Sequence, residues 1–226
     1  MNIVPVITLD GPGGVGKGTL GRLLAHDLGW HLLDSGAIYR ALALAAQRAG
    51  LDADNETALS GLARTLPLGF RGAADETHVL LGGEVVDAEI RTPEVSALTS
   101  RIAAIPAVRA ALLQRQRDFR RAPGLVADGR DMGTVVFPDA PLKVFLTASA
   151  EERGKRRLNQ LMEQGISASL ATVVAEIAER DARDQQRSVA PLRPAPDAKI
   201  LDTSEQSVSD TYRVLQSWVR SAFQEN

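Results

Sequence analysis

The chain has 226 residues, of which 44% are hydrophobic and 24% charged, and its formal net charge is −2. These values are typical of one globular α/β core, and the near-neutral charge gives no reason to expect nucleic acid or a membrane surface as a partner. The sequence contains no cysteine, which excludes disulfides and thiolate metal sites. We recognise no signal peptide and no apolar run of membrane-spanning length, so we expect a cytoplasmic protein, and we expect it to be a monomer.

A glycine-rich segment near the N-terminus is the strongest motif. The apolar run before it, Ile3–Leu9, predicts a buried strand, and Leu20, Leu24 and Leu28 lie on one face of a predicted helix that Gly29 ends. In that setting glycines free backbone N–H groups to converge on a phosphate, and a lysine can reach the terminal phosphates. The predicted phosphate-binding residues are Gly11, Pro12, Gly13, Gly14, Val15, Gly16, Lys17, Gly18 and Thr19.

The hydroxyl of this motif stands one place later than the strict pattern requires. Gly18 separates Lys17 from Thr19, which indicates a subset of phosphate-loop proteins other than the switch GTPases. A glycine-rich turn that binds nothing is the competing interpretation. The predicted strand before the segment and the predicted helix after it argue against that interpretation.

Four further apolar runs predict strands. They are rich in Val, Ile and Leu without polar alternation, as expected for a parallel sheet that is covered by helices on both faces. The runs are Trp30–Leu33, Gly124–Ala127, Leu142–Leu146 and Lys199–Leu201. Ligands of such sheets bind beyond the carboxyl ends of the strands, so the site is expected near the aspartates found there. These are Asp10, Asp34, Asp128 and Asp202.

Helix signals separate most of these runs. The alanine-rich segment Ile38–Ala49 predicts a helix that ends at Gly50. Thr92, followed by proline, predicts the start of another helix, and Pro106 predicts the start of a third that carries Arg109.

Two regions depart from the strand–helix alternation. In residues 66–90, two apolar runs on either side of Gly82-Gly83 predict a hairpin and hence a small antiparallel insert. Residues 151–190 are highly charged and mostly helical in pattern, and the proline-rich connector Pro191–Pro196 follows them.

Several charged residues are candidates for a phosphate chemistry. Asp128 could orient Mg²⁺ directly or through water, although an Asp-Gly pair also suits a plain turn. Arg40 could bind a phosphate, although a surface arginine is the alternative. A stripe with spacings of three and four predicts one cationic helical face, for which a solvated row of ion pairs is the alternative. Its members are Arg180, Arg183, Asp184 and Arg187.

Taken together, these motifs resemble those of the bacterial cytidylate kinases, which transfer phosphate from ATP to CMP or dCMP. The resemblance covers nearly the whole chain, and the stretch from Ala127 to Pro138 is specific to that family, whereas the phosphate loop is shared by a superfamily. The matching stretches are Gly11–Thr19, Leu32–Arg40, Glu89–Thr92, Val108–Arg117, Ala127–Pro138 and Glu176–Pro191.

The resemblance implies an α/β fold of the phosphate-loop NTPase type. Its single domain would hold a five-stranded parallel sheet with helices on both faces, a small antiparallel β insert and a helical lid. The core would comprise about residues 1–35, 107–150 and 191–226, the monophosphate-binding region about residues 36–106, and the lid about residues 151–190.

The resemblance also assigns expected roles to individual residues. ATP would be held by residues 11–19 together with Arg153 and Arg157, with Lys17 on the transferring group. Nucleotide chemistry, rather than the resemblance, implies Mg²⁺, which would be held through Thr19 and Asp128, directly or through water. The residues expected to be catalytic are Lys17, Arg130, Asp128 and Arg187. Those expected to bind CMP are Ser35, Arg40, Ser100, Arg109, Arg130, Asp131, Arg180, Asp184 and Arg187.

The chemistry of phosphoryl transfer is consistent with this set. The acceptor phosphate is largely dianionic at neutral pH, so cations that bring two anions together are needed more than a general base. Asp131 could accept from the amino group of cytosine while Arg109 donates to its acceptors, which would disfavour uracil. Closure of a lid would exclude water as a competing acceptor. The lid residues expected to drive closure are Arg153, Arg156, Arg157 and Arg183.

Two alternatives stay open at this point. The acceptor could be another small molecule, such as UMP, dTMP or shikimate. The chain could also be a nucleotide-dependent switch without transferase activity, although such a switch would not need a second anion site with arginines at positions 40, 130 and 187.

Overall fold

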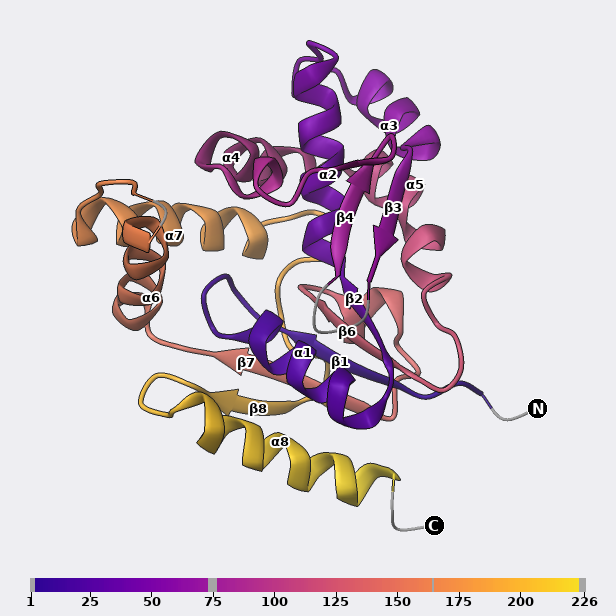
Figure 1. Ribbon diagram of the computed structural model, residues 1–226, viewed down its shortest axis with the longest axis vertical. Helices are drawn as coiled ribbons and strands as arrows, with labels where there is room; N and C mark the ends of the chain where they lie inside the picture. Colours follow the sequence, from indigo (N-terminus) through magenta and orange to yellow (C-terminus); the bar gives the residue numbers. More distant parts are fainter. Residues whose placement is uncertain (1–2, 73–76, 164, 224–226) are drawn as a thin grey trace.

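A five-stranded parallel sheet forms the centre of the computed structural model, which describes residues 3–72, 77–163 and 165–223 (Figure 1). The strands lie in the order β2-β6-β1-β7-β8, and every neighbouring pair is parallel. Their bounds are β1 Val6–Asp10, β2 His31–Asp34, β6 Leu125–Gly129, β7 Leu142–Thr147 and β8 Lys199–Asp202. The five strands expected from the sequence are thus confirmed, with ends shifted by up to three residues.

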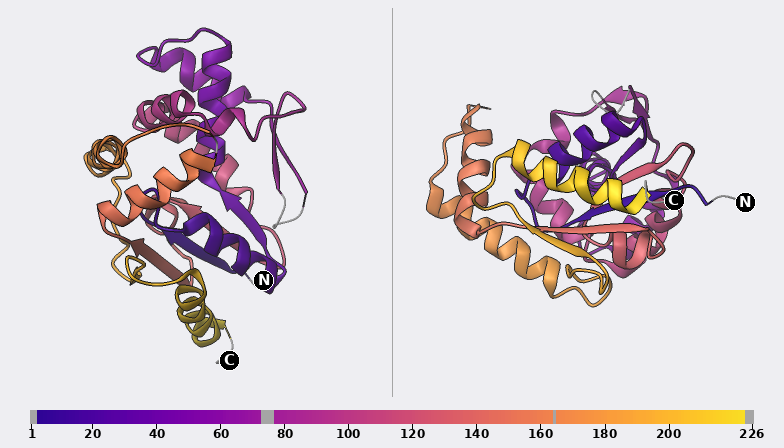
Figure 2. Two further views of the ribbon diagram at one scale, coloured as in Figure 1. Left: turned by 60° about the vertical axis from the view of Figure 1, so that its left-hand side comes forward. Right: turned by 90° about the horizontal axis from the view of Figure 1, so that it is seen from below.

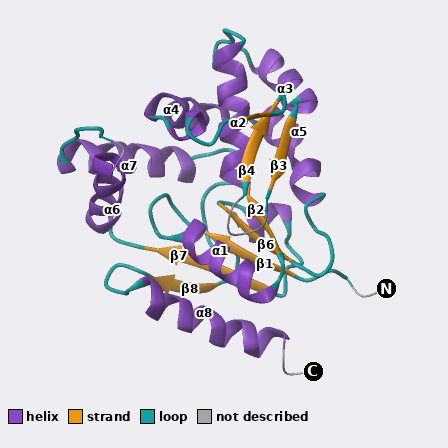
Figure 3. Ribbon diagram, in the orientation of Figure 1, coloured by secondary structure: helices purple, strands orange, loops and turns teal. Residues whose placement is uncertain are grey.

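Helices cover both faces of this sheet (Figure 3). Alternate residues of β6 divide between two apolar clusters, because successive side chains of a strand point to opposite faces. Val126 packs in the cluster with α1 and α8, while Leu125 and Ala127 pack in the cluster with α2, α3 and α5. These helices are α1 Lys17–Leu28, α2 Ser35–Arg48, α3 Glu56–Thr65, α5 Pro106–Arg117 and α8 Val208–Phe223.

The antiparallel insert lies at the opposite end of the molecule from α8 (Figure 1). It contains β3 Leu68–Arg71, β4 His78–Leu81 and β5 Glu84–Val85, paired in that order. The expected hairpin is confirmed, since Gly82 and Gly83 connect β4 to β5 with φ of 60° and 90°. Strand β3 adds a third strand that the sequence pattern did not resolve, and residues 73–76 of the expected insert lie outside the described residues. The 3₁₀ turn η1 Glu89–Arg91 and helix α4 Pro93–Ile102 follow.

Two helices, α6 Ala150–Glu163 and α7 Leu170–Gln185, pack against each other as a hairpin at one side of the molecule (Figure 2). An ion pair of 2.6 Å between Arg153 and Asp181 joins them. One prediction here was wrong, because α7 ends at Gln185 and Arg187 lies beyond the helix. The chain turns back there, as the Leu192 N–H bonds the Asp184 carbonyl at 2.9 Å. Residue 164 of the expected lid lies outside the described residues.

Local signals explain most helix ends. Gly29 ends α1 at φ 63°, and the Thr92 side chain caps α4 by accepting from the Val95 N–H, as expected. Helix α2 starts three residues earlier than its apolar pattern indicated, because the Asp34 side chain caps it by accepting from the Ala37 N–H. That cap places Ser35 on the first turn of α2.

Among the described residues, no single helix has the length and apolar character needed to cross a membrane. Helices α4 and α5 reach those limits only when taken together, and they meet at a bend of 100°.

Candidate functional site

The phosphate loop connects β1 to α1 at the carboxyl edge of the sheet. Gly14 and Gly16 have φ of 81° and 93°, a region that glycine enters without strain. Gly16 caps α1 with no side-chain hydrogen bond, and the first turn of α1 contains no acidic residue. The first N–H groups of α1 and its positive dipole end are therefore directed at the loop, as an anion site requires.

Lys17 is buried at the start of α1, with 6% of its surface exposed. Its Nζ donates to the Pro12 carbonyl at 2.6 Å, which bends the side chain back over the loop. Burial lowers the pKa of Lys17 to about 7, with a further lowering by the Arg130 charge, while Asp128 and Asp10 act in the opposite direction. An anion placed on the loop would therefore favour the protonated ammonium.

The helix α6 lies directly on the phosphate loop. A Cβ at Gly14 would lie 3.2 Å from the Arg153 Cβ, and Arg153 Nη1 donates to the Gly13 carbonyl at 3.4 Å. Arg156 Nη2 donates to the Thr203 carbonyl at 2.6 Å, and the Thr203 hydroxyl bonds the Val15 carbonyl at 3.1 Å. The loop, α6 and the segment after β8 therefore form one packed unit.

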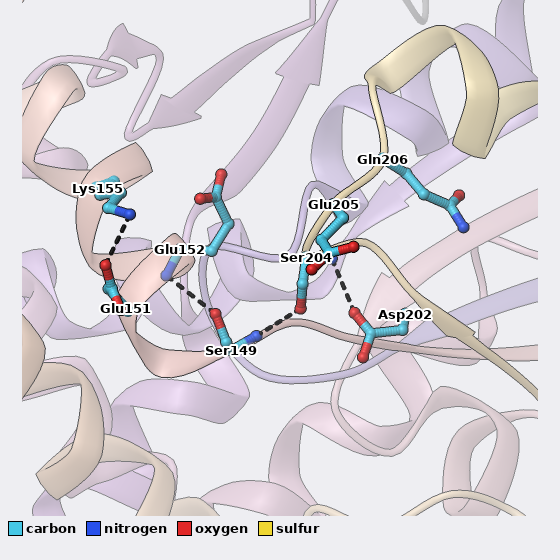
Figure 4. Close-up of a pocket in the computed structure, with 8 residues that line it drawn as sticks. All are labelled: Ser149, Glu151, Glu152, Lys155, Asp202, Ser204, Glu205 and Gln206. Atoms are coloured by element: carbon cyan, nitrogen blue, oxygen red, sulfur yellow. Dashed lines mark hydrogen bonds and ion pairs between the residues drawn. The ribbon is translucent and has the colours of Figure 1, made fainter.

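A hollow of about 660 Å³ opens beside this unit (Figure 4). Hydrogen bonds order its wall, since the Ser149 N–H donates to Ser204 Oγ at 2.9 Å and the Ser204 N–H donates to Asp202 Oδ1 at 2.8 Å. Its lining carries more carboxylates than cations. The lining residues are Ser149, Glu151, Glu152, Lys155, Asp202, Ser204, Glu205 and Gln206.

Asp128 lies near the end of β6, facing the start of α1. A Cβ at Gly18 would lie 3.6 Å from Asp128 Oδ2, so the carboxylate reaches the first turn of the helix that also carries the exposed Thr19. Burial raises the pKa of Asp128 to about 6, although the Lys17 charge lowers it. In the described part of the chain, no group of three or more His, Cys, Asp or Glu side chains could hold a metal by itself.

A buried ion pair joins Arg109 of α5 to Asp131, two residues after the end of β6. The exposed fractions of the two side chains are 8% and 5%. The Arg109 guanidinium lies 5.6 Å from the ring centroid of Tyr39 and also donates to the Ala103 carbonyl at 3.1 Å. Ser100 is buried, and its hydroxyl has no hydrogen-bond partner among the described residues. Such unpartnered polar atoms are uncommon in protein interiors and suit a ligand.

Arg40 folds back over the first turn of α2. Its Nη2 donates to Asp34 Oδ2 at 2.8 Å, while its buried Nε has no partner among the described residues. Gly36 permits this conformation, because a Cβ there would lie 2.7 Å from Arg40 Nη1. Gly129 likewise leaves room for Ser35, because a Cβ added at Gly129 would lie 2.7 Å from the Ser35 hydroxyl.

Three arginines surround one carboxylate at the end of α7. Asp184 is 1% exposed and accepts from Arg130 Nε at 3.1 Å and from Arg187 Nη2. Burial lowers the pKa of Arg180 to about 10, and the charges of Arg130, Arg40 and Arg187 lower it further. The cluster carries more positive than negative charge, so it favours a bound anion.

The structure therefore brings most of the expected site residues to one edge of the sheet. Arg183 forms an ion pair of 3.3 Å with Glu179 of its own helix, and its buried Nε has no partner among the described residues. Arg157 lies half-buried on α6, one turn after Arg153. The sequence placed Asp34 at a strand end near the expected site but did not show that it pairs with Arg40. It also did not show that Asp181 pairs with Arg153 or that Thr203 contacts the loop and Arg156.

Comparisons with known proteins match nearly the whole chain to one family. Residues 7–220 match the family model described as cytidylate kinase. The chain is 54% identical to the cytidylate kinase of Photobacterium profundum, covering 98% of this chain and 97% of that protein. It is 56% identical to that of Methylococcus capsulatus (96% and 98% covered) and 60% identical to that of Pseudomonas aeruginosa (91% and 90% covered).

Solved structures match the chain at much lower identity. A gluconokinase from Sinorhizobium meliloti has 15% identity and a TM-score of 0.47, with 100% of both chains covered. A shikimate kinase from Bacteroides thetaiotaomicron has 14% identity and a TM-score of 0.46, covering 96% of this chain and 98% of the other. With its family model matched from residue 7 to residue 220 and relatives at 54–60% identity, the chain belongs to the cytidylate kinase family.

Proposed function

We propose that this protein transfers the γ-phosphate of ATP to CMP or dCMP, giving ADP and CDP or dCDP. The family match and the identity of 54–60% to cytidylate kinases support this activity over that of a UMP, dTMP or shikimate kinase. The observation that carries the proposal is the buried Arg109–Asp131 pair, whose Asp131 directly follows Arg130 of the arginine cluster around Asp184. A nucleotide switch would need the phosphate loop but neither of these features.

The donor nucleotide would place its phosphates on the loop from Gly11 to Thr19. The open N–H groups at the start of α1 and the buried ammonium of Lys17 support this placement. The hollow beside α6 would take the base and sugar of ATP, because its carboxylates repel phosphates but accept hydrogen bonds from an amino group. Arg153 and Arg157 would contact the phosphates from the side of α6.

Magnesium would be held by the nucleotide phosphates together with Asp128 and Thr19, directly or through water. The fit rests on the Asp128 carboxylate, which reaches the first turn of α1. When bound, the ion would neutralise charge on the transferring phosphate. Asp128 would orient the ion, and Lys17 would neutralise the remaining side of the same phosphate.

The acceptor would lie between the end of β6 and α7. Arg40, Arg130 and Arg187 would bind its phosphate, since each has donor capacity on a planar fork that suits phosphate oxygens. Asp131 would accept from the amino group of cytosine, and Arg109 and Ser100 would pair with the remaining edge. Ser35 would border the base, and Arg180 and Asp184 would reach the ribose.

Catalysis would come from position and charge. Two anions repel each other, and the cations of the loop and of the arginine cluster would offset that repulsion while the reacting oxygens are held in line. No general base is required, because the acceptor phosphate is already largely dianionic at neutral pH. Closure of α6 and α7 would exclude water and suppress ATP hydrolysis.

The three-part division expected from the sequence remains part of this proposal. Residues 1–35, 107–150 and 191–226 would form the core, residues 36–106 the monophosphate-binding region, and residues 151–190 the lid. We also propose that the chain acts as a monomer in the cytoplasm without a nucleic-acid or membrane partner. Light scattering after size-exclusion chromatography would test whether the chain is a monomer.

A coupled assay of ADP formation tests the activity. ATP is offered with CMP, dCMP, UMP, dTMP or shikimate, and the rate with CMP or dCMP is expected to exceed the others by at least about tenfold. Equal rates with and without any acceptor would contradict the proposal. Calorimetric titration with CMP alone separates the remaining alternative, because a switch without an acceptor site would show no binding.

A further inference from the structure

Asp10 is a buried carboxylate to which the roles above assign nothing. It is the last residue of the central strand β1, is 5% exposed, and lies in register with Gly129 on β6. Its Oδ1 accepts from the Met132 N–H at 2.8 Å, and its Oδ2 accepts from the Gly133 N–H at 2.8 Å. Both oxygens thus hold backbone groups that are more than 120 residues away along the chain.

These two N–H groups begin the short π-helical turn η2, Met132–Val136. The first N–H groups of a helix have no partner within it and need an outside acceptor. The residue that would normally supply one, Asp131, makes no capping bond, because its carboxylate is paired with Arg109. Asp10 therefore takes over the cap and leaves Asp131 available to the proposed base pocket.

Asp10 lies between the proposed ATP side and the proposed CMP side of the site. The next residue, Gly11, starts the phosphate loop at φ 142°, where a side chain would collide with the Leu146 carbonyl. On the other side, the segment held by Asp10 continues directly from Arg130 and Asp131. Arg130 in turn reaches the loop, since a Cβ at Gly13 would lie 3.7 Å from its Nη2.

We propose that Asp10 is a positioning residue, whose carboxylate holds Arg130 and Asp131 at a set distance from the phosphate loop before CMP arrives. The proposal rests on the roles proposed above for those two residues. Asp10 itself would touch neither substrate. Burial raises the pKa of Asp10 to about 7, and its two backbone hydrogen bonds oppose that rise. Burial of a carboxylate costs folding free energy, so we would not expect a buried aspartate at this position if it had no positioning role.

The variant Asp10→Asn tests this role. An amide has one acceptor oxygen, so one of the two N–H groups would lose its partner and face another donor. We expect the KM for CMP to rise and kcat to fall, each by about tenfold, while the KM for ATP stays within about twofold. The preference for CMP over UMP should narrow. An unchanged KM for CMP with an unchanged preference would overturn the proposal, whatever the stability of the variant.

Thr8→Val is the matched control. Thr8 lies two residues earlier on the same face of β1, is fully buried, and its hydroxyl has no partner among the described residues. The change keeps the shape of the side chain and removes only a hydroxyl that has no partner among the described residues, so the kinetic constants should stay within about twofold of wild type.

Amide hydrogen exchange on the wild-type protein gives a second measurement if Asp10→Asn fails to fold. The Met132 and Gly133 amides should exchange slowly without CMP and change little when it binds. Fast exchange that only CMP slows would mean that the substrate orders this segment, which would overturn the proposal. Failure of the wild-type protein to form ADP with CMP would contradict the proposed function. It would not affect the exchange measurement, which requires no activity and would still test the role of Asp10.

Discussion

Most residues proposed to bind ATP phosphates follow one another from Gly11 to Thr19, whereas those proposed to bind CMP come from α2, α4, α5, α7 and the segments that follow β6 and α7. The proposed donor side consists mainly of backbone N–H groups at a helix start and of Lys17, with Arg153 and Arg157 added from α6. The acceptor side consists of side chains, and ion pairs from distant parts of the chain hold several of them.

This difference has an electrostatic consequence. Helix-start N–H groups keep their direction whether or not an anion is present, because the α1 backbone fixes them. Arginines must be held in place, and here Asp34 holds Arg40 while Asp184 holds Arg130 and Arg187. The acceptor side is therefore more sensitive to the loss of a carboxylate partner than the donor side.

Removal of the donor-side cation should have the largest effect. For Lys17→Met we expect kcat to fall by about 10³-fold, because a charge placed on the transferring group is lost. The variant should be no less stable than wild type, since burial disfavours the charged lysine. Steady-state kinetics and urea denaturation measure both. Lys199→Met, at the far end of β8, is the control, and a loss of less than tenfold for Lys17→Met would contradict the donor-side assignment.

Removal of a carboxylate from the acceptor side should change substrate choice. For Asp131→Ala we expect kcat/KM for CMP to fall by about 10²-fold and that for UMP by about tenfold, so that the preference narrows. The unpaired Arg109 charge should also destabilise the fold by about 3–5 kcal/mol. Asp139→Ala, which breaks the exposed pair with Arg120, serves as the control. Equal relative losses on both substrates would remove Asp131 from base recognition.

The lid arginines should not contribute equally. Arg153 joins the phosphate loop to Asp181 of α7, whereas Arg183 pairs with Glu179 on its own helix. We expect Arg153→Met to lower kcat by about tenfold and to increase ATP hydrolysis relative to transfer, because closure would be weakened. Arg183→Met should lower kcat by no more than about threefold, since an exposed pair within one helix is worth little. Equal losses would contradict this difference.

The smallest effect near neutral pH is expected from the protonation of Lys17. The pKa of Lys17 is lowered to about 7 in the free protein, and a bound phosphate favours the charged form. Binding of Mg·ATP should therefore take up a proton, and its affinity should fall as pH rises from 7 to 9, by at most about tenfold per pH unit. Calorimetry in two buffers of different ionisation enthalpy measures the uptake. In Lys17→Arg the side chain stays protonated, so a pH dependence equal to that of wild type would contradict this origin.

Local patterns in the sequence were enough to predict the five parallel strands, the phosphate loop and the hairpin at Gly82-Gly83. Each depends on residues a few places apart, because strand and turn preferences act over that range. The pattern was less accurate at the ends of two helices. The cap by Asp34 moved the start of α2, and the turn of the chain after Gln185 placed Arg187 outside α7.

The sequence by itself predicted most of the proposed donor side, because nine consecutive residues, Gly11 to Thr19, form the phosphate-loop motif. Through the resemblance to cytidylate kinases, it also predicted the residues that we propose for the acceptor side. Only the tertiary structure decided their partners, such as Asp10 with Met132 and Arg153 with Asp181. These contacts depend on strand order and helix packing, because residues far apart along the chain meet only when the whole sheet is assembled.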